Sequence, residues 1–205
     1  MPDIKICILD YGSGNVGSIS NLLNYLDYTS IISNNVEDIK NASHIILPGV
    51  GSFGSSMSKI NQKIPVDILE NEIVHKGKPF LGICVGMQVL TQNGFENGDN
   101  KGLGWIKGSV RKLQTNSLPL PHIGWNNISV SINNLLTENL EDIDDFYFVH
   151  SYYCDIDNNY VLSNTTYGQT FCSILNYNNI FGVQFHPEKS QKAGQKIIKN
   201  FIHNL

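Results

Sequence analysis

A cysteine between two glycines is the clearest candidate for a reactive group in the chain. The segment Gly82-Ile83-Cys84-Val85-Gly86 follows an apolar run of strand length and precedes apolar residues at helical spacing. Such a pattern is typical of a nucleophile elbow, in which a strained turn lifts the side chain out at the end of a strand. The positive end of the following helix favours a thiolate at that place. We therefore predict that Cys84 is a nucleophile, although an isolated cysteine is more often a buried packing residue.

Backbone N–H groups close to this cysteine are suited to stabilise negative charge on a substrate oxygen. Val85 directly follows the nucleophile, so its N–H is a natural oxyanion donor. The loop Pro48-Gly49-Val50-Gly51 follows another predicted strand and offers a second source of such donors.

A cysteine nucleophile needs a base, and His186 is the best of the six histidines for that role. It follows the strand-like run Phe181-Gly182-Val183-Gln184-Phe185 and precedes Pro187-Glu188. The proline disfavours helical geometry at His186. Residues two apart in an extended segment face the same side, so the Glu188 carboxylate can orient the imidazole. We predict a catalytic triad of Cys84, His186 and Glu188.

Other motifs allow weaker interpretations. Gly12-Ser13-Gly14-Asn15-Val16-Gly17 has the spacing of a dinucleotide-binding turn, but Ser33-Asn34-Asn35 stands where the ribose-binding acid belongs, and Glu37 lies beyond the strand. A tight turn between a strand and a helix is the better interpretation. No histidines or cysteines fall at metal-ligand spacing, so we expect no metal and no cofactor. Spacing alone leaves His150-Ser151-Tyr152-Tyr153 open between substrate contact and a solvated loop.

The order of predicted elements indicates an α/β fold. Apolar strands at 4–9, 31–32, 44–47 and 79–83 alternate with helical patterns at 16–26, 36–41 and 68–75, which predicts an open, mostly parallel sheet with helices on both faces. Beyond Gly104 the chain is rich in strands, at 105–113, 125–132, 146–149, 160–167, 171–175 and 180–185, before a final helix at 193–202. No linker or repeat separates the two halves, so we expect a single domain over 1–205.

The amino-acid composition and net charge indicate which classes of binding partner to expect. The chain has 205 residues, 41% hydrophobic and 16% charged, with a net charge of −4, which is typical of a globular protein and poor for binding nucleic acid or anionic membranes. No signal peptide or membrane-spanning run is visible, and the four cysteines have no C-x-x-C spacing. We expect a cytoplasmic protein with reduced thiols and a small-molecule substrate or a protein partner.

With these residues in view, the chain resembles the triad, or class I, glutamine amidotransferases, and within them the HisH type of glutaminase subunit from imidazole glycerol phosphate synthase. The likeness spans nearly all 205 residues. It rests on Asp10-Tyr11-Gly12-Ser13-Gly14-Asn15, Pro48-Gly49-Val50-Gly51, Gly82-Ile83-Cys84-Val85-Gly86-Met87-Gln88, Gly102-Leu103-Gly104, Pro121-His122-Ile123-Gly124-Trp125-Asn126, Val149-His150-Ser151-Tyr152-Tyr153 and Gly182-Val183-Gln184-Phe185-His186-Pro187-Glu188-Lys189-Ser190.

The resemblance implies a flavodoxin-like sheet and hydrolysis of the glutamine side-chain amide through a thioester on Cys84. It also implies that Gly51 supplies the second oxyanion N–H, after a rotation of its loop. Glutamine contacts implied by the family pattern are Gln88, Glu96, Ser151 and Tyr152. The family pattern places Asn15, Trp125, Asn126 and Lys189 near a partner.

That implied partner is a HisF-type (β/α)₈-barrel cyclase, which would receive the ammonia through a sealed path for histidine biosynthesis. The amidotransferase pattern occupies the chain from Asp10 onward, so we expect the ammonia acceptor to be bound by another subunit. Two alternatives stay open. One is a glutaminase that feeds a synthase amidating a nucleotide-linked or surface-polysaccharide sugar, and the other is a non-catalytic binding module on the same scaffold.

Overall fold

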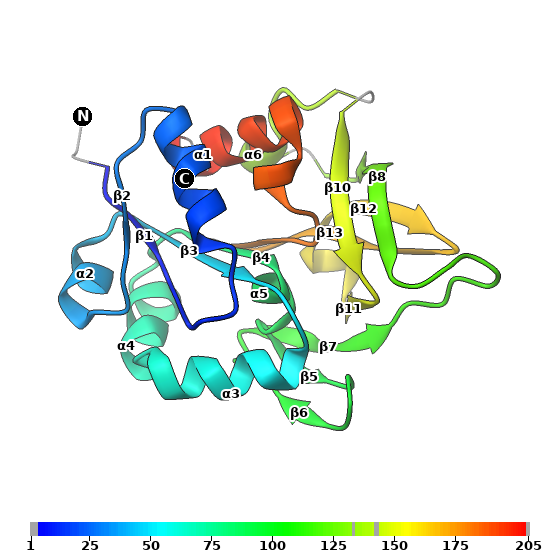
Figure 1. The fold of residues 1–205 in the computed structure, drawn as a ribbon, viewed down its shortest axis with the longest axis horizontal. Coiled ribbons are helices and arrows are strands. Elements are labelled where there is room, and N and C mark those ends of the chain that lie inside the picture. Colours follow the sequence, from blue (N-terminus) through cyan, green and yellow to red (C-terminus); the bar gives the residue numbers. More distant parts are fainter. Residues whose placement is uncertain (1–3, 133, 142–143, 204–205) are drawn as a thin grey trace.

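The computed structural model describes residues 4–132, 134–141 and 144–203, and its centre is a mixed β-sheet (Figure 1). Among these residues the sheet has eight strands, in the order β2 (Ser30–Ile32), β1 (Ile6–Ile8), β3 (His44–Gly49), β4 (Phe80–Cys84), β14 (Ile180–Val183), β13 (Gln169–Tyr177), β12 (Val161–Tyr167) and β9 (Ser129–Val130). Neighbours from β2 to β14 are parallel, and those from β14 to β9 are antiparallel. The predicted α/β class with an open, mostly parallel sheet is confirmed.

Helices cover both faces of the parallel half. Figure 1 shows α1 (Val16–Tyr25) and α6 (Gln191–His203) on one side, with α3 (Phe53–Lys63) and α4 (Val66–Glu70) on the other. The shorter helical elements are α2 (Val36–Asn41), η1 (Asn71–His75), α5 (Val85–Gln88), η2 (Leu135–Thr137), η3 (Asn158–Tyr160) and η4 (Pro187–Lys189). Every residue of β1, β3 and β4 is buried, as expected for strands covered on both faces.

Two smaller sheets extend the strand-rich half. One is formed by β11 (Tyr152–Ile156), β7 (Ile106–Lys112), β5 (Thr91–Gly94) and β6 (Asn100–Lys101). The other is a ribbon of β8 (His122–Asn127) and β10 (Asp145–His150). Buried apolar residues of both halves belong to one core cluster, so the halves share their packing.

The structure differs from the sequence prediction at several places, and strands β5, β6 and β11 were not predicted. The region 125–132 forms two strands rather than one, because β8 pairs with β10 whereas β9 pairs with β12 of the central sheet. The helix after Cys84 ends at Gln88, and the chain turns directly into β5. Helix α3 was not predicted, although Phe53, Met57 and Ile60 are buried at helical spacing.

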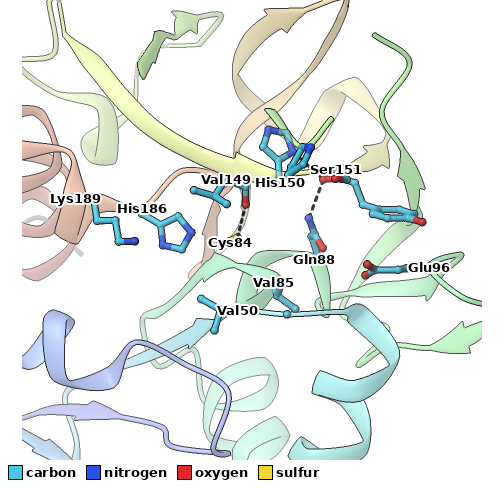
Figure 2. Close-up of a pocket in the computed structure, with 13 residues that line it drawn as sticks. Val50, Cys84, Val85, Gln88, Glu96, Val149, His150, Ser151, His186 and Lys189 are labelled. Carbon is cyan, nitrogen blue, oxygen red and sulfur yellow. Dashed lines mark hydrogen bonds between the residues drawn. The ribbon is translucent and has the colours of Figure 1, made fainter. Parts of the chain in front are cut away.

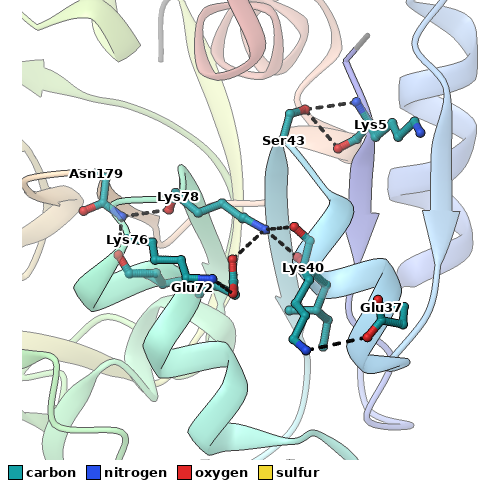
Figure 3. A network of polar contacts seen from close by, with 10 residues as sticks. Lys5, Glu37, Lys40, Ser43, Glu72, Lys76, Lys78 and Asn179 are labelled. Carbon is teal, nitrogen blue, oxygen red and sulfur yellow. Dashed lines mark hydrogen bonds and ion pairs between the residues drawn. The ribbon is translucent and has the colours of Figure 1, made fainter. Parts of the chain in front are cut away.

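Glu72 of η1 forms a buried ion-pair network with Lys76 and Lys78, which lie between η1 and β4 (Figure 3). Glu72 is 3% exposed and binds Lys78 Nζ at 3.1 Å and Lys76 Nζ at 2.6 Å. Lys78 Nζ also donates to the carbonyls of Ile39 (2.6 Å) and Lys40 (2.8 Å) in α2. Burial alone would raise the pKa of the Glu72 carboxyl, but the two lysines outweigh that effect and lower the pKa. Lys78 therefore links α2 to η1, because it bonds to carbonyls of α2 and to Glu72 of η1.

Within the described ranges, no helix combines the length and apolar character that a bilayer crossing requires.

Candidate active site

Cys84 lies at a sharp turn between β4 and α5, as the G-x-C-x-G pattern predicts. Its backbone has φ 55° and ψ −111°, a conformation that residues with a side chain rarely adopt. Such strain persists only where the surrounding structure enforces it, and it is concentrated at functional sites. Val85 is the first residue of α5, so its N–H has no acceptor within the helix and is free to stabilise charge beside the sulfur.

Close packing between α5 and the end of β3 explains why glycine is required at positions 86 and 49. A Cβ atom at Gly86 would lie 1.9 Å from Leu47 O of β3, which no contact between a carbon and an oxygen tolerates. A Cβ atom at Gly49 would lie 2.6 Å from Gly86 N and 2.5 Å from Tyr11 Oη. The glycines therefore let α5 rest directly on the end of β3, and this contact fixes the position of Cys84.

His186 follows β14, the strand next to β4, and is held by β10. Its N–H donates to Tyr147 O at 2.9 Å, and its carbonyl accepts from Ser190 Oγ at 2.7 Å. The ring nitrogen Nδ1 lies 2.9 Å from Glu188 Oε1. Because the carboxylate only accepts, Nδ1 is the donor, and Nε2 is left for the sulfur side. The His186 and Glu188 side chains are 5% and 1% exposed, so their interaction is shielded from water.

The sulfur and the imidazole interact across the cavity. Burial alone would lower the pKa of His186 from 6.5, but hydrogen bonding and charge interactions with Cys84 and Glu188 raise it to about 10. The raised pKa favours the protonated imidazole, the form that gives a proton to a leaving group. The structure thus brings Cys84 together with His186 and Glu188, which lie 102 and 104 positions further along the sequence.

A cavity of about 270 Å³ opens in front of Cys84 (Figure 2). All six residues expected to contact the substrate or the oxyanion line it, namely Gly51, Val85, Gln88, Glu96, Ser151 and Tyr152, together with Cys84, His186 and Lys189. One oxygen of Glu96 accepts from the N–H of Phe53 at 2.8 Å and so caps α3. Gln88 is 3% exposed, and its amide nitrogen donates to Tyr152 O at 2.9 Å.

The loop that carries Gly51 is held from outside the cavity. The N–H of Val50 donates to Ser13 O at 2.7 Å, in the glycine turn before α1. Gly51 has a φ of +101°, which favours glycine at that position. The turn before α1 therefore packs against the loop that carries Gly51, and Gly14 has a structural role there because a Cβ atom would lie 2.6 Å from Pro48 O.

The residues expected at a partner interface occupy different positions. Trp125 is 48% exposed, and its ring lies edge-on to Tyr147 at 5.8 Å. Lys189 Nζ lies 5.5 Å from the centre of the same Tyr147 ring, so Trp125 and Lys189 share one surface. Asn126 instead turns inward and donates to Thr166 O at 3.1 Å. Asn15 precedes α1, and its carbonyl accepts from Ile19 N–H at 3.2 Å.

The sequence prediction missed two groups that contact the nucleophile. Gln184 is fully buried and places its amide nitrogen 3.7 Å from Cys84 Sγ. The thiol lies 3.9 Å from Val149 O, to which it can donate. The predicted strand 180–185 contained a signal for Gln184, which stands two residues before His186, but in the structure the strand ends at Val183 and residues 184 and 185 form a bend.

Comparison with known proteins agrees with this geometry. The model of the class-I glutamine amidotransferase domain matches residues 7–205. Imidazole glycerol phosphate synthase subunit HisH 2 of Methanococcus maripaludis is 47% identical, and the match covers 96% of this chain and 98% of that protein. Subunit HisH of Methanocaldococcus jannaschii is 44% identical, with 98% and 100% covered.

Solved structures show the same fold at low identity. The structure of PurLQS from Thermotoga maritima superposes with a TM-score of 0.72 at 18% identity and covers 98% of this chain and 99% of that one. The crystal structure of a glutamine amidotransferase from Thermotoga maritima gives a TM-score of 0.65 at 16% identity, with 98% and 83% covered. The domain match and the extended identity to HisH proteins show that the chain belongs to the class-I glutamine amidotransferase family, within its HisH group.

Proposed function

We propose that this chain is the glutaminase subunit of an imidazole glycerol phosphate synthase, which hydrolyses L-glutamine to glutamate and ammonia and passes the ammonia to a cyclase subunit in histidine biosynthesis. The observation that carries the proposal is the meeting of a strained Cys84 with His186 in one cavity, with Glu188 bonded to the imidazole from behind. The relatives at 44–47% identity are named as subunits of that synthase.

The proposed reaction has two halves. Cys84 gives its thiol proton to His186, its sulfur attacks the side-chain carbonyl carbon of glutamine, and the N–H groups of Val85 and Gly51 stabilise the oxyanion. His186 then protonates the leaving nitrogen, the C–N bond breaks, and ammonia departs from a γ-glutamyl thioester. Water next attacks the thioester, His186 takes its proton, and the C–S bond breaks to release glutamate. Glu188 holds the His186 ring in the tautomer that serves both steps.

The cavity offers complementary groups for the rest of the substrate. A carboxylate at Glu96 suits the α-amino group of glutamine, and the hydroxyl groups of Ser151 and Tyr152 suit its carboxylate or amide. The Gln88 amide nitrogen already serves two acceptors, Tyr152 O at 2.9 Å and Gln184 Oε1 at 3.0 Å. Its oxygen therefore supports a second contact with the α-amino group.

The proposed partner is a HisF-type (β/α)₈ cyclase that covers the cavity mouth. Ammonia would be protonated in bulk water, so a sealed route between the subunits is required. Exposed apolar side chains support docking at the outer face of β8, where Ile123 and Trp125 are 59% and 48% exposed. Lys189 extends this surface toward the cavity, and we propose that Asn15 and Asn126 complete it.

We also place this subunit in the cytoplasm. All four cysteines are free thiols, which fits a reducing compartment.

The function is tested with the complex of this chain and the cyclase. Cys84→Ala should abolish glutamine-dependent synthesis of imidazole glycerol phosphate while synthesis from added ammonia continues. Cys7→Ala is the matched control, because Cys7 is also a buried thiol but lies in β1 and outside the cavity. Glutamine-dependent synthesis by the Cys84→Ala complex would overturn the proposal.

A further inference from the structure

Two buried histidines face each other at the end of the β8–β10 ribbon, and one of them, His150, lines the cavity. The antiparallel register places His122 opposite His150. His122 Nδ1 and His150 Nε2 are 3.0 Å apart, and the residues are 2% and 6% exposed. Neither ring has a role in the proposed reaction. Buried titratable groups beside an active site often have a functional role, and this pair has none in the reaction itself.

The direction of every hydrogen bond along the pair follows from a carbonyl at one end. Tyr152 O can only accept, so His150 Nδ1, at 2.9 Å, is the donor. The unprotonated Nε2 of a neutral His150 then accepts from His122 Nδ1. His122 Nε2, left without a proton, lies 3.4 Å from the amide nitrogen of Asn126, whose orientation is fixed by its bond to Thr166 O. Both rings therefore carry their proton on Nδ1.

The surroundings keep both rings neutral. Burial lowers the pKa of His122 to about 4. Burial also lowers the pKa of His150 to about 3; the Tyr152 carbonyl opposes this effect, while the charges of His122 and His186 add to it. The His122 ring is stacked between Tyr167 and Phe148, with ring centres 4.0 and 5.0 Å away. A neutral pair leaves the neighbouring His186 free to hold the positive charge.

The hydrogen-bond chain continues from the pair into the substrate cavity. Tyr152 O, which accepts from His150, also accepts from Gln88 Nε2 at 2.9 Å (Figure 2). Gln88 Nε2 donates in addition to Gln184 Oε1 at 3.0 Å, and Gln184 Nε2 in turn lies 3.7 Å from Cys84 Sγ. The Tyr152 carbonyl thus sets the orientation of the Gln88 amide, and the Gln88 amide sets that of the Gln184 amide. The first fixed point is the Tyr152 carbonyl.

We propose that His122 and His150 are positioning residues that hold the Tyr152 carbonyl, and through it the Gln88 side chain, in the orientation that binds glutamine. This proposal rests on the glutaminase function proposed above. The alternative is that the pair only fills space among the aromatic rings of β10, β12 and β13.

Two substitutions at His150 separate positioning from packing. Asn places its amide nitrogen near the site of Nδ1, so His150→Asn can keep the donation to Tyr152 O. Gln is closer to histidine in size but places its amide near the site of Nε2, so His150→Gln loses that donation. Positioning predicts that His150→Gln raises the KM for glutamine about tenfold, the usual effect of one lost hydrogen bond, with kcat changed less than about threefold. His150→Asn should have the clearly lower KM of the two.

The measurement uses steady-state glutaminase kinetics of the complex with the cyclase. His75→Gln, an exposed change on η1, is the control for a general effect of replacing a histidine by glutamine. Equal KM values for the two His150 variants, or a lower KM for His150→Gln, would overturn the proposal. A wild-type complex without glutaminase activity would overturn the proposed function itself. That result differs from a failure of the positioning proposal, which shows as a wrong order of KM values in variants of an active complex.

Nuclear magnetic resonance of the ¹⁵N-histidine-labelled protein tests the proton positions directly. His122 and His150 should each give the signals of a neutral ring protonated on Nδ1, opposite to the tautomer that predominates in free histidine. His122→Gln and His150→Gln assign the two rings. A ring of His150 protonated on Nε2 would overturn the proposal, even where the enzyme is active, because Tyr152 O would then have no donor from it.

Discussion

Substitution of Gly86 by alanine should disrupt the site through a single added methyl group. Gly86 is the second residue of α5, and its α-carbon faces the end of β3. Elsewhere in a helix the same change stabilises, because alanine has the higher helix propensity. Gly17 in α1 provides that matched control, since a Cβ atom there would meet nothing within 4 Å.

The expected magnitude follows from the distance to Leu47. A Cβ atom at Gly86 would lie 1.9 Å from Leu47 O, whereas ordinary contacts between carbon and oxygen are about 3.3 Å or longer. The turn must therefore move by more than about 1 Å. Overpacking of this kind costs about 1–3 kcal/mol of unfolding free energy or more. The displacement of Cys84 and Val85 should also reduce glutamine hydrolysis about 100-fold, because catalysis is sensitive to misplacement of about 1 Å.

Urea unfolding of the isolated chain and glutaminase assays of the cyclase complex measure the two effects. Gly86→Ala should lower the unfolding free energy and the activity together. Gly17→Ala should raise the unfolding free energy by about 0.5–1 kcal/mol, with activity retained. A Gly86→Ala protein that matches the wild type in both stability and activity would refute the packing argument for the elbow.

Two further predictions concern stability. Lys78→Met should lower the unfolding free energy by about 3–5 kcal/mol, because it removes a positive partner from the buried carboxylate of Glu72. Lys40→Met breaks only an exposed ion pair and should change the unfolding free energy by less than about 1 kcal/mol. Equal effects of the two substitutions in urea unfolding would contradict this prediction. Burial lowers the pKa of His44 from 6.5 to about 4, so the unfolded state binds the proton first and stability falls as pH drops below about 6.5. His44→Phe should therefore reduce the slope of unfolding free energy against pH by up to about 1.4 kcal/mol per unit between pH 6.5 and 4, and an unchanged slope would show that His44 does not titrate in this way.

The parallel half of the fold was predictable because its signals are local. The strands at 44–47 and 79–83 are short apolar runs bounded by Pro or Gly, and the buried β3 and β4 match them closely. Helix α3 was missed because its region is rich in serine and its first turn is capped by Glu96, 43 residues further along. Capping by a residue so distant leaves no mark next to the helix.

The candidate site shows the same division between local and distant information. Cys84 was predicted from its flanking glycines and Glu188 from its two-residue spacing to His186. The two side chains do meet at 2.9 Å, but Glu188 lies in the 3₁₀ turn η4 and not in the extended segment that the prediction assumed. The pairing of His122 with His150 depends on the register of β8 against β10. Register between strands 28 positions apart cannot be read from either segment alone. The break of 125–132 into two strands depends likewise on which sheet each part joins.

The central claim is that Cys84 becomes acylated by glutamine with the help of His186. The most direct test treats the complex of this chain and the cyclase with a glutamine analogue that carries a diazoketone. Mass spectrometry of the chain then locates the adduct. One adduct per chain is expected, on Cys84, formed far more slowly in His186→Ala and at the normal rate in Cys7→Ala. An adduct on another residue, or labelling of Cys84 at the same rate without His186, would contradict the claim.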